Sequence, residues 1–173
     1  MSDFLERVTG QQDAFKKLGS HIPGFNGYIE RQNRRAADKL LRETVARRFE
    51  EQWKRASQLQ EDMVSNGMIE YVDEVEKAAI KLRTFADKIK TATYGYSGFF
   101  DATKINEEEL NTIYQFDAAF FDVAEQIGGA LDNVEASFGD AEGIKAAIRN
   151  VVTLTRNAVE LFDRRYETIN GAQ

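Results

Sequence analysis

Residues 72–89, VDEVEKAAIKLRTFADKI, carry the regular apolar stripe that decides the fold class of this chain. The stripe consists of Val72, Val75, Ala79, Leu82, Ala86 and Ile89. Its steps alternate between three and four residues, which is the heptad spacing of helices that pack along a shared seam. The pattern therefore predicts a helix over residues 67–93 that folds back antiparallel on the helix before it.

The preceding segment has a similar stripe over a greater length. Its apolar residues are Ala37, Leu41, Val45, Phe49, Trp53, Ala56, Leu59 and Met63. From Tyr28 to Asn66 no glycine or proline interrupts the pattern, and Gly67 is a natural helix stop. We predict one helix over residues 27–66, which at the usual rise per residue is roughly 60 Å long.

A third helix is predicted to start at Asn106, which three glutamates follow. The Asn106 side chain can accept an N–H bond as the helix cap, and Glu109 can reach back to complete a capping box. Carboxylates are also favoured at the positive end of a helix. The stripe beyond them predicts a helix over 106–138, with Gly128-Gly129 as a kink or break.

A last helix is predicted over residues 140–170, starting at Gly139-Asp140. Its expected inner side consists of Ile144, Ala147 or Ile148, Val151, Leu154, Ala158, Leu161 and Tyr166. Residues 1–24, which end at the Pro23-Gly24 turn, read as an amphipathic N-terminal arm. The chain is therefore predicted to be one all-α domain over residues 1–173: an elongated, antiparallel, up-and-down four-helix bundle of coiled-coil type, with that arm.

Composition excludes several classes of chemistry. The chain has no cysteine, which excludes disulfides, thiolate nucleophiles and cysteine-ligated metals. No apolar run approaches the roughly 18 residues of a membrane span, and residues 1–20 lack the pattern of a signal peptide. We therefore expect a cytoplasmic protein.

The net charge of −6 hides an uneven distribution along the chain. Between Arg31 and Arg55 nine residues are basic and four are acidic. Between Tyr94 and Gly143 Lys104 is the sole basic residue, against eleven acidic ones. This opposition suggests that the two blocks meet, either within one molecule or between copies.

Catalytic motifs are not found in the sequence. Ser97 is directly followed by Gly98, whereas a nucleophile elbow needs that glycine one place later. The only histidine, His21, is next to the proline turn, and no Glu-x-x-His pair of a di-iron bundle is present. Asp117 is close to an apolar stripe, and we interpret it as a boundary carboxylate paired with Arg or Lys of a neighbouring helix. We predict no catalytic residue, no cofactor and no metal.

Three segments are candidate interaction surfaces. The aromatic loop, Tyr94, Tyr96, Phe99 and Phe100, is interpreted as a plug over the end of the bundle, with a partner-binding patch as the alternative. The arm can pack on the bundle or on another subunit, or bind an anionic membrane through Phe4, Leu5, Val8, Phe15 and Leu18 with Lys16 and Lys17. The basic flank of the second helix consists of Arg31, Arg34, Arg35, Arg42 and Arg48. Acidic residues alternate with this flank, so a salt-bridged face is favoured over nucleic-acid binding.

Two runs of sequence resemble a known family. IPGFNGYIERQNRRAADKLLRE (residues 22–43) and YGYSGFFDATKINEEEL (residues 94–110) together resemble a family of bacterial helical proteins that has no assigned activity. The resemblance covers roughly the first two thirds of the chain. It implies a bacterial origin and a helical fold, and it transfers no site residue, cofactor or partner.

These observations predict a non-enzymatic helical-bundle protein that works through protein–protein contact, as a homo-oligomer. Long apolar seams, opposed charge blocks and the missing catalytic motifs support this hypothesis. The alternative is a peripheral membrane-surface adaptor that uses the N-terminal arm and the basic second helix.

Overall fold

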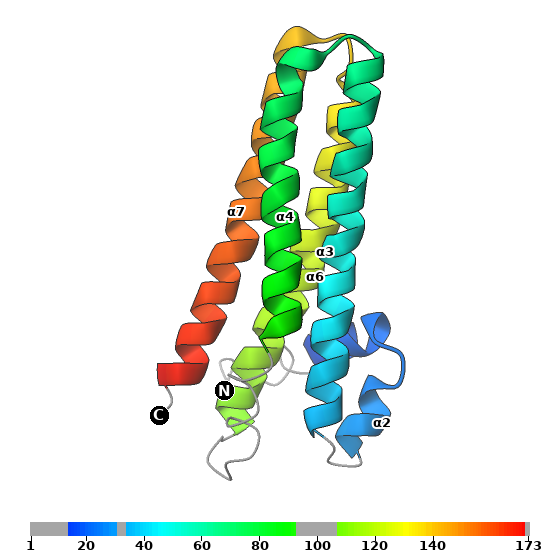
Figure 1. The fold of residues 1–173 in the computed structure, drawn as a ribbon. Coiled ribbons are helices and arrows are strands. Elements are labelled where there is room, and N and C mark those ends of the chain that lie inside the picture. Colours follow the sequence, from blue (N-terminus) through cyan, green and yellow to red (C-terminus); the bar gives the residue numbers. More distant parts are fainter. Residues whose placement is uncertain (1–13, 31–33, 93–106, 172–173) are drawn as a thin grey trace, which may run out of the picture.

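A computed structural model describes residues 14–30, 34–92 and 107–171 (Figure 1). These residues are helical apart from short turns, which confirms the all-α prediction. After a first helix at residues 14–21, the elements are α2 (Phe25–Glu30), α3 (Arg34–Ser65), the short 3₁₀ helix η1 (Ile69–Tyr71), α4 (Val72–Thr91), α6 (Glu107–Ala136) and α7 (Ala141–Gly171).

The four long helices α3, α4, α6 and α7 lie side by side with alternating direction and form an elongated bundle (Figure 1). α3 packs against α4 and α6, and α7 packs against the same two helices. Therefore α4 and α6, which are consecutive long helices in the chain, occupy opposite corners of the bundle. The α3–α4 and α6–α7 turns lie at one end, which we call the turn end, and α2 lies near the other (Figure 1).

One phenylalanine from each long helix joins the four helices in a common aromatic layer. Phe85 of α4 is the centre of this layer. Its ring centroid lies 4.7 Å from that of Phe49 in α3 and 6.0 Å from those of Phe120 in α6 and Phe162 in α7. Edge-to-face contacts such as the first and last of these are favoured by the quadrupole of aromatic rings.

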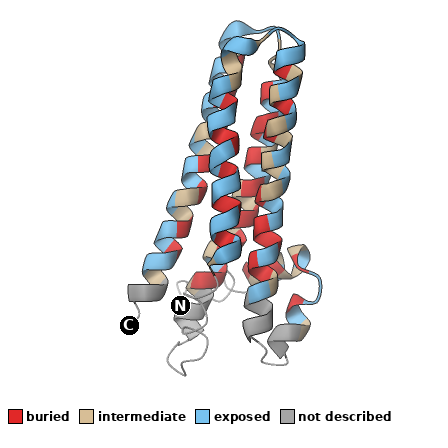
Figure 2. Cartoon of the chain, in the orientation of Figure 1, coloured by how far each residue is buried: buried red, intermediate tan, exposed pale blue. Residues whose placement is uncertain are grey.

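The seam predicted for residues 72–89 faces the core. Its members from Val75 to Ile89 are buried, and Val72 is partly buried. Figure 2 shows that buried residues line the inner sides of the helices. Ala78 and Phe85, which the predicted stripe leaves out, are buried as well. The inner face of α4 is thus wider than a single heptad seam, as it must be for a helix that packs against two neighbours.

The inner side of α7 differs from the predicted one. One buried seam, with alternating steps of four and three, consists of Ile144, Ile148, Val151, Thr155, Ala158, Phe162 and Arg165, and Ala147 beside it is buried as well. Tyr166 is 56% exposed, so its predicted place on the inner side is wrong. The apolar pattern was misleading because two members of the true seam, Thr155 and Arg165, are polar.

The single helix predicted over residues 27–66 is also wrong at its start. α2 ends at Glu30 and packs against α3, which begins at Arg34 (Figure 1). Phe25 at the start of α2 is buried, and its ring lies 5.6 Å from that of Phe15 and 6.0 Å from that of Tyr114. No glycine or proline lies between α2 and α3, so the sequence carries no breaker signal for the end of α2.

The helix ends and breaks predicted at glycines have different outcomes. Gly67 and Gly139 adopt positive φ angles of 76° and 88° at the two turns, as helix stops require. Asp140 caps α7, because its Oδ1 accepts a hydrogen bond of 3.1 Å from the Gly143 N–H. Of the kink or break predicted at Gly128-Gly129, the break is wrong, since α6 continues through both glycines.

Candidate functional site

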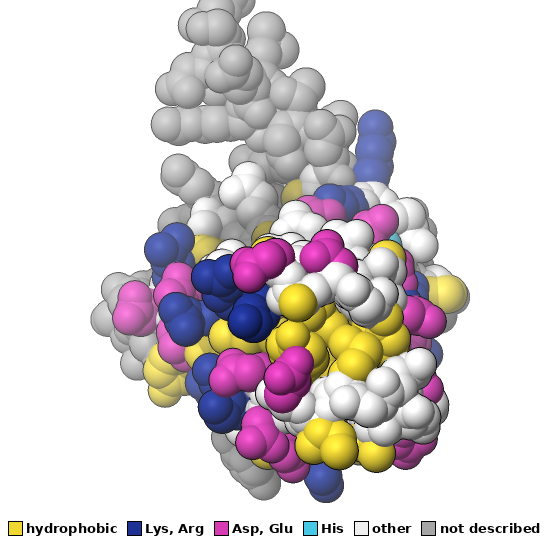
Figure 3. All heavy atoms as spheres, turned by 90° about the horizontal axis from the view of Figure 1, so that it is seen from above, with side chains coloured by type: hydrophobic (Ala, Val, Ile, Leu, Met, Phe, Trp, Pro, Cys, Tyr) yellow, Lys and Arg dark blue, Asp and Glu magenta, His cyan; other side chains and the backbone are white. Residues whose placement is uncertain are grey.

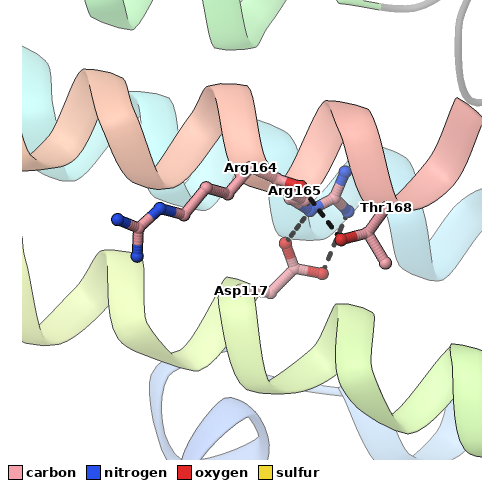
Figure 4. A network of polar contacts seen from close by, with 4 residues as sticks. All are labelled: Asp117, Arg164, Arg165 and Thr168. Carbon is pink, nitrogen blue, oxygen red and sulfur yellow. Dashed lines mark hydrogen bonds and ion pairs between the residues drawn. The ribbon is translucent and has the colours of Figure 1, made fainter. Parts of the chain in front are cut away.

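Asp117 of α6 and Arg165 of α7 form a buried ion pair between neighbouring helices (Figure 4). Arg165 donates from Nε to Asp117 Oδ1 at 2.5 Å and from Nη2 to Oδ2 at 3.1 Å. Asp117 is 3% exposed and Arg165 is 2% exposed. The predicted pairing of Asp117 with a basic residue of a neighbouring helix is confirmed, although the pair is in the core rather than at its boundary.

This pair joins two neighbouring helices through two hydrogen bonds. Both carboxylate oxygens of Asp117 accept a hydrogen bond from one guanidinium, the strongest geometry available to such a pair. No cluster of three metal-ligating side chains is found in residues 14–30, 34–92 and 107–171. The pair therefore supplies a cross-link between α6 and α7.

A cleft of about 540 Å³ lies between α3 and α6, beside the first helix. His21 is on its wall, and the imidazole stacks on the ring of Phe121 at 4.4 Å with an interplanar angle of 1°. On the α6 side, Glu125, Gly128 and Asp132 follow Phe121 at helical spacing. A cleft of this volume is within the range of small-molecule sites.

Two glycines and a glutamine are among the residues that line the cleft. A Cβ at Gly128 would lie 3.2 Å from Oε1 of Gln52, so this glycine allows the Gln52 side chain to lie on α6. A Cβ at Gly129 would meet nothing within 4 Å. Packing thus explains Gly128 but not Gly129, which leaves open space on the helix. Gln52 Oε1 is buried and accepts no hydrogen bond.

The charged side chains around the cleft are unequally paired. Arg55 contacts Asp132 and lies 3.7 Å from Glu135, while Arg48 lies 3.7 Å from Glu51. Glu125 forms no hydrogen bond or ion pair with any residue that the structure describes. The cleft wall has three carboxylates, those of Glu51, Glu125 and Asp132, and two guanidinium groups.

Exposed apolar side chains gather at the turn end of the bundle. Ile69 is 67% exposed and Val64 is 54% exposed, and Met68 between them is partly buried. We call Val64, Met68 and Ile69 the turn-end patch. Figure 3 looks onto this end and shows hydrophobic side chains bordered by acidic and basic ones. Large exposed apolar residues that lie close together are typical of contact surfaces.

The two turns of this end lie close to each other. Tyr71, at the end of η1, is near enough to Glu142 of α7 to be affected by its charge. The pKa of Tyr71 is raised, first by a hydrogen bond with Glu70, then by burial and by the charges of Glu70 and Glu142. The turn-end patch itself is made of residues of the α3–α4 turn, and the α6–α7 turn lies at the same end of the bundle (Figure 1).

The predicted surfaces are only partly within the described residues. The aromatic loop lies outside them, as do Phe4, Leu5, Val8 and Arg31, and the side chains of Arg34 and Arg35. Leu18 is fully buried and Phe15 packs against the core, so this part of the arm contacts the bundle. Lys16 is exposed, whereas Lys17 forms an ion pair with Asp122 of α6.

The basic flank does not form one surface. Arg42 is buried, while Arg48 is exposed and faces the cleft. Arg55, from the same basic block, contacts Asp132 and Glu135 of the acidic block. The two charge blocks therefore meet within one molecule, which is one of the two arrangements that the sequence left open.

Sequence reasoning missed the cleft. The available signal was Gln52, which stands in the series Val45, Phe49, Gln52, Ala56 and Leu59 at a seam position of α3. A polar residue at such a position, together with an adjacent glycine pair on another helix, indicates a gap in the apolar packing.

No family model, curated protein or solved structure matches this chain. The resemblance stated from residues 22–43 and 94–110 thus stays a prediction. Among the helices in the described part of the chain, none is both long and apolar enough to cross a membrane.

Proposed function

We propose that this is a non-enzymatic, cytoplasmic helical-bundle protein that associates with a second copy of itself through the turn-end patch. The observation that carries the proposal is the exposure of Ile69 and Val64 together at the turn end of the bundle. Burying such side chains against a partner contributes roughly 25 cal/mol per Å² of apolar surface removed from water.

The polar features of the bundle support the same proposal. The buried pair of Asp117 and Arg165 fixes α6 against α7. Arg55 ties α3 to α6 on the surface. Arg55 and Asp132 lie in the half of the bundle that leads to the turn end, so their ion pair holds α3 against α6 in that half.

Sedimentation velocity tests the proposal. The wild-type chain is expected to sediment as an oligomer, and the double variant Val64→Lys/Ile69→Lys as a monomer with unchanged helix content by circular dichroism. Ile80→Lys is the matched control, because Ile80 is 57% exposed but lies on α4, away from the turns. It should leave the oligomer intact. A wild-type chain that stays monomeric at every concentration would overturn the proposal.

A further inference from the structure

The cleft between α3 and α6 has the features of a small-molecule site. It has a volume of about 540 Å³ and polar side chains from three elements: His21, Gln52 of α3 and Glu125 of α6. It is distinct from the turn-end patch, and nothing in the proposed self-association uses it.

The hydrogen-bonding groups of the cleft indicate the chemistry of its ligand. Gln52 Oε1 is an acceptor without a donor, and the Glu125 carboxylate has no partner among the described residues. The Gln52 oxygen lies against Gly128, and both residues line the cleft. Both groups call for N–H donors, because a carboxylate and an amide oxygen can only accept.

The charge of the cleft agrees with a cationic ligand. Two guanidinium groups, Arg48 and Arg55, face three carboxylates, those of Glu51, Glu125 and Asp132. Each arginine already has a carboxylate partner, so Glu125 is the charge without a counterpart. An anion would have to compete with these carboxylates for the arginines, whereas a cation finds Glu125 available.

Gly129 shapes the space for the ligand. A Cβ at this position would have no other atom within 4 Å, so the packing of the bundle does not require a glycine here. Gly129 is one helical turn beyond Glu125. An alkyl chain whose ammonium group reaches Glu125 can therefore lie against the bare backbone of α6, a contact that glycine permits.

From the unpartnered acceptors, the charge and the open backbone together, we propose that the α3–α6 cleft binds a small organic cation with N–H donors, of the aliphatic diamine class. Glu125 pairs with the ammonium group, Gln52 accepts from an N–H donor, and Gly129 accommodates the alkyl chain. The stacked His21 and Phe121 close one end of the site.

The single histidine of the chain gives the test a specific signal, since the imidazole protons of His21 have a resonance that no other residue shares. Titration of the full chain with putrescine, followed by NMR, is expected to shift this resonance to saturation. Inorganic phosphate and Zn²⁺, titrated separately, should not produce saturable shifts. No shift with putrescine, or saturation with phosphate or Zn²⁺ alone, would overturn the proposal.

Variants separate the site from general attraction of cations to an acidic protein. Glu125→Gln should weaken putrescine binding by about tenfold, since a charge-assisted hydrogen bond is lost. Glu160→Gln removes the same charge from an exposed position of α7 and should leave binding unchanged. Equal weakening by both would overturn the assignment.

A second pair of variants tests the shape of the cleft. Gly129→Leu fills the open space and should abolish the His21 shift, while Ala146→Leu, at an exposed position of α7, should preserve it. Circular dichroism checks that both variants are folded. Binding retained in folded Gly129→Leu would contradict the placement of the alkyl chain. Sedimentation of the same samples reports self-association separately, so either proposal can fail without the other.

Discussion

Asp117 and Gln52 both occupy seam positions of long helices at which the neighbouring turns carry apolar residues. Asp117 stands between Ile113 and Phe120 on α6, and Gln52 stands between Phe49 and Ala56 on α3. Asp117 meets Arg165, which binds both of its carboxylate oxygens. Gln52 meets Gly128, which offers no side chain, and its Oε1 accepts no hydrogen bond.

The difference shows that a polar residue in an apolar seam can have one of two roles. It can cross-link two helices, or it can line a binding site. A buried polar group with its partner built into the facing helix adds a specific cross-link, and the helices close around it. A buried acceptor without a partner costs stability, and its presence in a folded protein calls for an explanation. In this bundle the first case lies in the core between α6 and α7, and the second lines the cleft between α3 and α6.

The largest effect is expected when the sealed pair is broken. Arg165→Met leaves the Asp117 carboxylate buried without its counter-ion, and we expect a loss of about 3–5 kcal/mol in the free energy of unfolding. Urea unfolding followed by circular dichroism measures this loss. Arg164→Met is the matched control, since the Arg164 side chain points away from the pair (Figure 4), and it should change stability by less than about 0.5 kcal/mol.

The double variant Asp117→Leu/Arg165→Met refines the same test. Replacing a whole buried ion pair by apolar residues is often neutral or stabilising, so most of the loss should be recovered. If the double variant is as unstable as Arg165→Met, the pair contributes more than the mutual neutralisation of two buried charges.

A smaller effect, of the opposite sign, is expected at Gln52. Gln52→Leu removes a buried acceptor without a donor and makes the α3 seam apolar, so the free energy of unfolding should rise by about 1–3 kcal/mol. The rise is measured by urea unfolding against Gln115→Leu, a substitution at an exposed position of α6. A loss of stability in Gln52→Leu would mean that the Gln52 amide is satisfied in solution, and the contrast with Asp117 would disappear.

The smallest effect separates the two glycines of α6. Gly129→Ala should raise the free energy of unfolding by about 0.5–1 kcal/mol, because alanine is the better helix former and its Cβ meets open space. Gly128→Ala should gain less, since its Cβ would lie 3.2 Å from Gln52 Oε1 and this side chain must move. Thermal unfolding of both variants provides the comparison, and equal gains would contradict the close contact between Gln52 and α6.

Helix formation could be predicted from the sequence wherever apolar residues recur at heptad spacing. The stripe from Val75 to Ile89 is buried as predicted, and α7 begins after the predicted Asp140. The pattern failed on α7, where Thr155 and Arg165 hold core positions, because burial of a polar side chain depends on a partner that lies on another helix or another turn. Thr155 donates to the Val151 carbonyl and Arg165 to Asp117.

The sequence by itself determined the all-helical class, the turns at Gly67 and Gly139 and most of the apolar faces, since these depend on spacing within about four residues. Only the tertiary structure decided that α4 and α6 lie at opposite corners, that Asp117 meets Arg165, and that Gln52 lies over Gly128. These are contacts between residues far apart in the chain. They follow from how the helices pack, and periodicity within one helix does not specify which neighbour its polar positions will meet.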